Sequence, residues 1–157
     1  MKNTFSTVLI TSMVLATTAS QGQDNAIKKA EARSETRSEA KFDARAHSLN
    51  LSVDKNGTLK DAIHAVSVET GVPEAKIEAM HQKHPKAGPT GILAACVLAD
   101  ETKKDPERFL TRYSGGRTWT EIAADNKVPI EKLNVRLDRV ENYVNSSPEK
   151  RKLEKRR

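Results

Sequence analysis

Histidine and glutamate side chains at helical spacing are the part of this sequence that comes nearest to a metal-binding motif. Glu78, His81 and His84 lie three residues apart, so a helix would place them along one face, and His64 could approach from the preceding helix. A di-iron bundle needs a second Glu-x-x-His motif and further carboxylates, and a structural zinc site needs a fuller set of cysteine and histidine ligands. The sequence has neither, so we expect surface or helix-end histidines, no metal site and no cofactor.

Two carboxylates, Asp100 and Glu101, close the most apolar stretch of the chain and are candidates for acid catalysis. Burial raises the pKa of a carboxyl group, and a raised pKa allows it to act as a general acid. On a helix these adjacent side chains would point about 100° apart, so a polar continuation of the helix is the preferred interpretation. The sequence shows no Ser-His-Asp order, phosphate-binding loop or Cys-x-x-Cys motif, and it therefore favours a non-enzymatic protein with no catalytic residues.

The loop between Tyr113 and Trp119 combines aromatic, basic and glycine residues. Tyr113, Arg117 and Trp119 are candidate ligand-binding residues for an anion or a sugar, because they surround glycines at the start of a helix, where free amide groups can bind anions. A helix C-cap followed directly by an N-cap explains the same residues without a ligand. Both interpretations stay open at this point.

Positive charge is concentrated at the C-terminus. The formal net charge of the chain is +6, yet residues 48–148 carry 14 basic and 14 acidic side chains, whereas residues 149–157 carry six basic and two acidic ones. The expected anion-binding residues are the bases of this tail, namely Lys150, Arg151, Lys152, Lys155, Arg156 and Arg157. They predict an alternative function, the binding of an anionic polymer or nucleic acid.

The elements that would position these side chains are arranged around one apolar stretch, residues 91–99. Its sequence, Gly-Ile-Leu-Ala-Ala-Cys-Val-Leu-Ala, continues into charged residues up to Lys104 and favours a buried central helix over a buried strand. Cys96 is the only cysteine, so an intramolecular disulfide is excluded. We expect its thiol to pack in the core rather than to react or to pair with another chain.

A capped helical hairpin is expected before this stretch. Thr58-Leu59-Lys60-Asp61 predicts a capping box that starts a helix, and Gly71 predicts a left-handed residue at its end. Pro73 then opens a second helix, which Pro85 stops. Residues 86–90 are expected to form a loop before the central helix.

A second hairpin repeats this pattern after a short helix. Asp105-Pro106-Glu107 predicts the short helix, Thr118-Trp119-Thr120-Glu121 predicts another capping box, and Val128-Pro129 starts a last helix up to about Asn145. The proline starts match those of the first hairpin at an offset of 56 residues and the caps at 60, which indicates a helical hairpin repeat with a longer leading helix in the first copy. The last helix carries apolar residues at spacings of 3, 4, 3 and 4, suited to docking on the central helix or to a dimer seam: Ile130, Leu133, Leu137, Val140 and Val144.

The second hairpin has counterparts in known families. Residues 119–133 resemble helix-turn-helix DNA readers through Trp119-Thr120-Glu121-Ile122-Ala123 and Val128-Pro129-x-x-x-Leu133, although Asn126-Lys127 replaces the usual turn glycine and the core lacks clustered bases for phosphates. The same rhythm is similar to the peptidoglycan-binding LysM repeat, which requires a strand on each side of its helix pair. Taken whole, residues 58–144 resemble uncharacterised exported bacterial helical proteins with paired helix-turn-helix-like hairpins, a group without assigned activity. That resemblance implies fold and location only.

These patterns predict an all-α fold, a small orthogonal bundle of about six helices in which two capped helical hairpins flank a buried central helix. The expected segments are a signal peptide over residues 1–22, a charged linker (disordered or a lone helix) over 23–48, a helical domain over 49–148 and a basic tail over 149–157. Within the domain, Leu49, Leu51 and Val53 alternate with polar residues, which predicts a short extended segment.

Residues 1–22 have the features of an export signal. Lys2 precedes a mostly apolar stretch over residues 5–16, and small residues allow cleavage after Ala19 or Gly22. The apolar stretch is shorter than the ~20 residues that a membrane span needs. We therefore expect a secreted or periplasmic protein, without a membrane span after processing, that binds an unknown protein or envelope component. The oligomeric state stays open.

Overall fold

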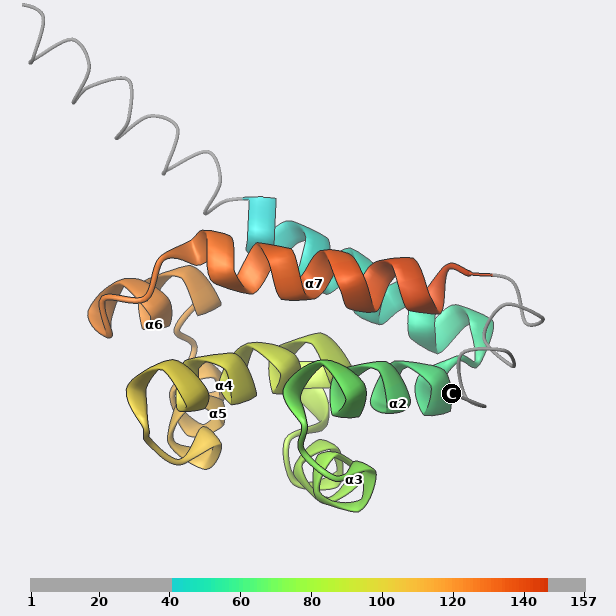
Figure 1. Ribbon diagram of the computed structural model, residues 1–157, viewed down its shortest axis with the longest axis horizontal. Coiled ribbons are helices and arrows are strands. Elements are labelled where there is room, and N and C mark those ends of the chain that lie inside the picture. The colour runs from blue at the N-terminus through green and yellow to red at the C-terminus, as the bar shows by residue number, and fades with distance from the viewer. Residues whose placement is uncertain (1–40, 147–157) are drawn as a thin grey trace, which may run out of the picture. The chain divides into compact units, whose positions relative to one another are not determined.

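All regular secondary structure in the described part of the chain is helical. The computed structural model describes residues 41–146, and within this range there are seven α-helices, one 3-10 helix and no strand (Figure 1). They are the N-terminal helix (described over residues 41–56), α2 (Leu59–Thr70), α3 (Glu74–Lys83), the 3-10 helix η1 (Pro85–Ala87), α4 (Gly88–Thr102), α5 (Pro106–Ser114), α6 (Trp119–Asp125) and α7 (Ile130–Val144). The predicted all-α bundle is confirmed, with one helix more than the expected six.

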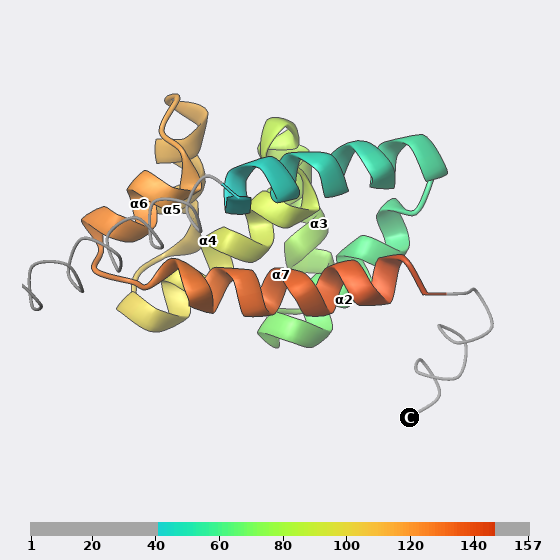
Figure 2. The ribbon, with the colours of Figure 1, turned by 90° about the horizontal axis from the view of Figure 1, so that it is seen from above.

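The central helix is α4, and the other helices pack around it. The N-terminal helix and α7 form a layer over α2 and α4, and α3 and α5 lie on the opposite side (Figures 1 and 2). Every residue from Gly88 to Leu98 is buried, as expected for a helix enclosed by others. The prediction of a loop over residues 86–90 is wrong, because α4 already begins at Gly88. Pro89 lies in the first turn of α4, where a backbone N–H has no intrahelical acceptor, so the missing N–H of proline costs no hydrogen bond.

The N-terminal helix corrects the sequence-based expectation for this region. Residues 49–53 are helical, so the predicted extended segment is wrong. The buried residues Phe42, Ala46, Leu49 and Val53 follow helical spacing, whereas Leu51, which completed the apparent alternation, is 56% exposed. The core therefore extends N-terminally of the expected boundary at Leu49. Residues 23–40 of the expected linker lie outside the described residues.

A tight turn joins the N-terminal helix to α2 and prevents the first predicted capping box. Gly57 has a positive φ of 63°, and the Thr58 amide donates to the Val53 carbonyl oxygen at 3.1 Å, which satisfies the end of the preceding helix. Thr58 thereby takes φ −95° and ψ 22° instead of an extended conformation, and its side chain makes no capping hydrogen bond. The predicted start of α2 is confirmed, but its capping box is wrong.

The other predicted helix ends are confirmed. Gly71 is left-handed with φ 70°, and Asp105 accepts a hydrogen bond from the Glu107 amide. Thr118 and Glu121 form the complete capping box of α6. In the turn between α6 and α7, Lys127 adopts φ 57°, the left-handed conformation that a turn glycine would otherwise supply.

The apolar seam of α7 faces the interior of the chain. All five seam residues, from Ile130 to Val144, are buried, so docking is confirmed over an exposed dimer seam. Among helices α2 to α6, the main neighbour of α7 is α2, with α4 second, whereas α4 was the expected partner. Charged pairs hold α7 in place at its edges. Arg45 Nη2 lies 2.5 Å from both Asp138 Oδ1 and Glu141 Oε2. Arg136 Nη1 lies 2.6 Å from Glu69 Oε1 of α2.

Cys96 is buried in α4, as predicted for a core thiol. Desolvation by burial raises its pKa to about 11 from an ordinary value of 9.0. A thiol with this pKa stays protonated at neutral pH, and the thiolate is the reactive form. The packing role is therefore supported over a reactive thiol.

Alkaline pH should destabilise the protein partly through Cys96. Above pH 9.0 the unfolded state loses the thiol proton while the folded state keeps it until about pH 11, so stability falls as the pH rises through this window. Between about pH 8 and about pH 10, wild type should lose about 1.4 kcal/mol more stability than Cys96→Ala. Urea unfolding of both proteins at the two pH values measures the difference. Equal losses would show that the thiol is solvated in the folded state.

Candidate functional site

The histidines singled out in the sequence do not converge. His64 Nδ1 lies 2.5 Å from Glu74 Oε1 and its ring packs near Tyr143, whereas His84 Nε2 lies 2.9 Å from Glu107 Oε2. Within residues 41–146 no three metal-binding side chains are grouped closely enough to hold an ion. His64 and His84 instead join neighbouring helices.

The carboxylates at the end of α4 are placed for solvation rather than for catalysis. Asp100 is exposed and accepts a hydrogen bond from Lys103 at 2.9 Å, and this bond lowers the pKa of its carboxyl group. A general acid at neutral pH needs the opposite shift. Glu101 Oε2 lies 2.5 Å from Lys132 Nζ of α7. The acid-catalysis hypothesis for Asp100 is therefore wrong, and both residues make ion pairs at the surface.

The two predicted terminal segments cannot be placed. The basic tail from Lys150 to Arg157 and the expected signal over residues 1–22 lie outside the described residues. Among the helices of residues 41–146, none combines the length and the apolar character that a membrane crossing requires.

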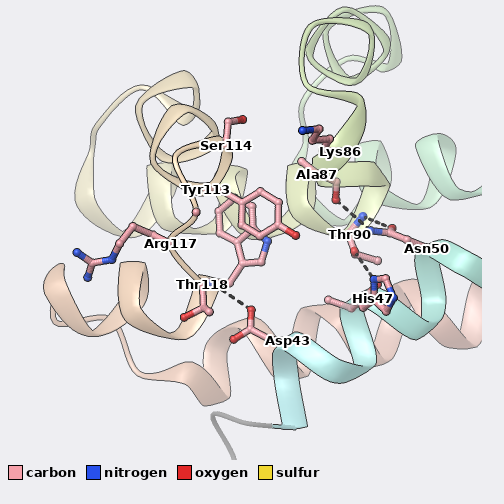
Figure 3. Close-up of a pocket in the computed structure, with 13 residues that line it drawn as sticks. Asp43, His47, Asn50, Lys86, Ala87, Thr90, Tyr113, Ser114, Arg117 and Thr118 are labelled. Atoms are coloured by element: carbon pink, nitrogen blue, oxygen red, sulfur yellow. Dashed lines mark hydrogen bonds between the residues drawn. The ribbon is translucent and has the colours of Figure 1, made fainter.

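The candidate ligand loop lines a hollow of about 350 Å³, which we call the aromatic pocket (Figure 3). Three segments far apart in the sequence surround it: the N-terminal helix, the start of α4 with η1, and the α5–α6 connection. The lining residues are Asp43, Ala46, His47, Asn50, Lys86, Ala87, Thr90, Tyr113, Ser114, Gly116, Arg117, Thr118 and Trp119. Tyr113, Arg117 and Trp119 are all among them, so the structure brings the predicted residues together at one place.

Stacked aromatic rings form one wall of the aromatic pocket. The rings of Tyr113 and Trp119 are nearly parallel, with centroids 4.6 Å apart and an interplanar angle of 12°. Trp119 is only 2% exposed, and it packs against the backbone of α4 at Gly91, where an added Cβ would lie 3.1 Å from the indole ring. Burial raises the pKa of Tyr113, and the Asp43 carboxylate adds to the rise. The wall is therefore held from behind by α4, and its tyrosine stays neutral well into alkaline pH.

Asp43 fixes the N-terminus of α6 beside this wall. Its carboxylate accepts hydrogen bonds from the Trp119 amide at 3.0 Å and from the Thr120 hydroxyl at 2.8 Å. A negative charge is favourable at a helix N-terminus. Asp43 lies in the stretch expected to be a linker, so sequence reasoning missed this contact between residues that are far apart in the chain.

Asn50 fixes the opposite wall. Its amide donates to the Ala87 carbonyl oxygen at 3.0 Å and its carbonyl oxygen accepts from the Thr90 amide at 3.2 Å, while the Thr90 hydroxyl donates to the Ala46 carbonyl oxygen. Gly88 makes this contact possible, because a Cβ there would lie 2.4 Å from the Asn50 side chain. The N-terminal helix is thus joined to the start of α4 by specific hydrogen bonds.

Only some of the charged side chains around the aromatic pocket are free to bind a ligand. The Arg117 guanidinium points away from the hollow (Figure 3) and binds Glu121 and Asp125 at 3.0 and 2.9 Å. Asp43 is engaged by α6. Lys86 and His47 are exposed at the mouth and make no ion pair with another described residue. The free charge of the described pocket is therefore positive, although Arg117, the base predicted from the sequence, does not supply it.

A line of hydrogen bonds at the rim joins Ser114, His84 and Glu107. Ser114 Oγ lies 3.4 Å from His84 Nδ1, and the other ring nitrogen lies 2.9 Å from Glu107 Oε2. Hydrogen bonds from Lys83 and His84 lower the pKa of Glu107, so its carboxylate is ionised and can orient the imidazole. The order of groups is that of a nucleophile, a base and an orienting acid. Sequence order alone did not reveal it.

This line lacks the oxyanion-binding groups that acyl transfer requires. Amides directed at the reacting oxygen usually supply that stabilisation. Here the amides that follow Ser114 are already used at the end of α5, because Gly115 donates to the Thr111 carbonyl oxygen at 3.0 Å and Gly116 donates to the Tyr113 carbonyl oxygen at 2.9 Å. We therefore assign Ser114, with His84 and Glu107, a structural role between α3 and α5.

The aromatic pocket is consequently equipped for binding. It offers an aromatic wall with the free Tyr113 hydroxyl, the unpaired cation of Lys86 and a fixed backbone, but no activated nucleophile. Comparison of the chain with protein-family models, curated proteins and solved structures found no match. Its function therefore has to be inferred from the site itself.

Proposed function

We propose that this chain is an exported, non-enzymatic binding protein that holds a protein or envelope component through the aromatic pocket. The observation that carries the proposal is the construction of the pocket from three distant segments, fixed by Asp43 on one side and Asn50 on the other. Binding sites are usually largely preformed hollows with few convergent polar groups. The aromatic pocket has both properties.

The distribution of charge supports binding over catalysis. Asp100, Glu101 and Glu107 are paired with lysines, and the hydroxyl of Ser114 has no amide donors beside it for an oxyanion. Lys86 at the mouth, in contrast, has no carboxylate partner among residues 41–146. An unpaired cation beside an aromatic wall favours recognition of a partner of complementary charge.

Export is supported by the first 22 residues, in which Lys2 precedes an apolar stretch and small residues follow it. Secretion or a periplasmic location would bring the pocket into contact with envelope components. The basic C-terminal residues support a second candidate, binding of an anionic polymer, because residues 149–157 concentrate six bases.

A crosslinked pull-down from the envelope fraction at low and high salt separates the two candidates. Wild type is compared with Lys86→Glu, with its matched surface control Lys60→Glu, and with a chain lacking residues 149–157. Our proposal expects a specific partner that survives salt, is kept by Lys60→Glu and the tailless chain, and is lost with Lys86→Glu. If capture is instead lost at high salt or without residues 149–157, and Lys86→Glu has no effect, the basic tail and not the pocket is the functional element.

A further inference from the structure

We propose that the aromatic pocket binds a pyranose ring that carries a carboxylate, that is, an acidic sugar. This inference rests on the proposed function, because it names the ligand class of the same pocket. Four features of the pocket carry it: its volume, its aromatic wall, its unpaired cation and the free polar groups, the Tyr113 hydroxyl and His47, at its mouth.

The volume and the wall favour a ring over a simple ion. A hollow of about 350 Å³ is in the range of small-molecule sites and far exceeds the space that a carboxylate or phosphate ion occupies. Tyr113 is only partly buried, so the tyrosine of the stacked pair is the member that reaches the hollow, while Trp119 supports it. The C–H faces of a pyranose pack well on an aromatic surface of this kind, because both are apolar and flat.

The charges favour an acidic ring over a neutral one. The two other charged groups of the lining, Asp43 and Arg117, are engaged with the α6 N-terminus and with acidic residues of α6. Lys86 lines the pocket together with Ser114 (Figure 3) and has no acidic partner among the described residues. A ligand carboxylate at this rim would gain a charge-assisted hydrogen bond from the ammonium group.

The polar groups at the mouth favour a hydroxylated ring over an aromatic acid. Tyr113 directs its hydroxyl toward the side of the hollow formed by Thr90 and Asn50, and His47 lies on the same side (Figure 3). The Ser114 and Thr118 hydroxyls are already used within the protein, whereas no hydrogen bond joins the Tyr113 hydroxyl or the His47 ring to another described residue. A planar aromatic acid could use Lys86 and the wall but would leave the Tyr113 hydroxyl and His47 without a partner, whereas sugar hydroxyls can both donate and accept.

The chain supplies its own probe for the test. Trp119 is its only tryptophan and lies behind Tyr113, so tryptophan fluorescence, excited where tyrosine absorbs little, reports on the pocket alone. The full chain is titrated with glucuronate, with glucose as the ring without charge, and with acetate as the charge without a ring. We expect a saturable fluorescence change with glucuronate, and at least tenfold weaker responses to glucose and to acetate.

Matched variants assign the interaction to named groups. Lys86→Met should weaken glucuronate binding about tenfold, the loss expected for one charge-assisted hydrogen bond, and Lys60→Met on α2 should leave it unchanged. Tyr113→Phe keeps the ring and removes the hydroxyl, so it should weaken binding less than Lys86→Met. Circular dichroism of each variant confirms that the fold is retained.

Three results would overturn the inference: no fluorescence change with glucuronate, an equal response to glucose or acetate, or full binding by Lys86→Met. Failure of the ligand class is separable from failure of the proposed function, because partner capture is measured without added sugar. Capture that depends on Lys86 together with no glucuronate binding would keep the binding function and reject the acidic sugar. A polyuronate added in place of the monosaccharide distinguishes a polymer ligand from a free sugar. Only a site that binds the polymer responds more strongly to the polyuronate than to glucuronate.

Discussion

Leu98→Asp is expected to abolish cooperative unfolding of the protein. Leu98 is 0% exposed and lies in the part of α4 that is enclosed by neighbouring helices. An unpaired carboxylate in such a site costs about 4–5 kcal/mol or more, which is comparable with the whole stability of a small domain, about 5–15 kcal/mol. Thermal and urea unfolding followed by circular dichroism should show a broad, non-cooperative transition or none.

Two matched aspartate substitutions test whether burial is the cause. Val97 is 7% exposed and lines a groove beside Arg136, so Val97→Asp can pair with that guanidinium and should be milder than Leu98→Asp. Leu51 is 56% exposed, and Leu51→Asp should change stability by less than about 0.5 kcal/mol. A normal melt for Leu98→Asp would mean that α4 is not the centre of the core.

Gly88→Ala is expected to destabilise the protein by about 3–5 kcal/mol. Gly88 has φ 62° and ψ 179°, a region that is almost restricted to glycine, and an added Cβ would lie 2.4 Å from the Asn50 side chain. The costs of backbone strain and of displacing Asn50 therefore add together. The hydrogen bond from Asn50 to the Ala87 carbonyl oxygen and the one from the Thr90 amide to Asn50 would be lost. Urea unfolding measures the change in the free energy of unfolding.

Gly57→Ala separates backbone strain from the clash. Gly57 has a similar φ of 63° but nothing within 4 Å of its ideal Cβ position, so this variant should lose about 1 kcal/mol. The pair Gly88→Ala and Asn50→Ala should be strongly non-additive, because Asn50→Ala removes the atoms that clash. Equal losses for Gly57→Ala and Gly88→Ala would contradict the close approach of Asn50 to α4.

Local signals predicted most helix ends correctly. The capping box at Thr118, the proline start at Asp105-Pro106 and the left-handed Gly71 each depend on residues within one helical turn. The same kind of signal failed at Thr58, because its amide is bound to the preceding helix. The position of the N-terminal helix decides whether Thr58 caps α2 or closes the end of the N-terminal helix.

A lone helix was one of the two expectations for residues 23–48, and the packing of the N-terminal helix was missed because its buried face is weakly apolar. Ala46 contributes little to a periodicity that rests on Phe42, Leu49 and Val53, and the neighbouring Leu51 imitates the alternation of a strand. Charged residues around Phe42 also suggested that this stretch lacked a face to bury. Packing against α4 and α7 supplies the missing stabilisation, and that packing is not visible in a local pattern.

The candidate site was half predictable for the same reason. Tyr113, Arg117 and Trp119 stand within one loop, so their combination could be noticed in the sequence. Asp43 and Asn50 come from the N-terminal helix, and their roles follow from hydrogen bonds to residues between 37 and 77 positions away. Spacing along the chain carries no signal for such contacts.

The central claim, that the mouth of the aromatic pocket is the binding surface, is tested most directly by site-specific photocrosslinking in the envelope. A photoreactive residue is placed at His47, which is exposed at the mouth of the pocket and leaves Lys86 in place, or at Val68, which is 70% exposed on α2 and does not line the pocket. We predict one defined crosslinked product from position 47 and none from position 68. Equal products at both positions, or a product at 68 alone, would contradict the assignment of the pocket as the binding surface.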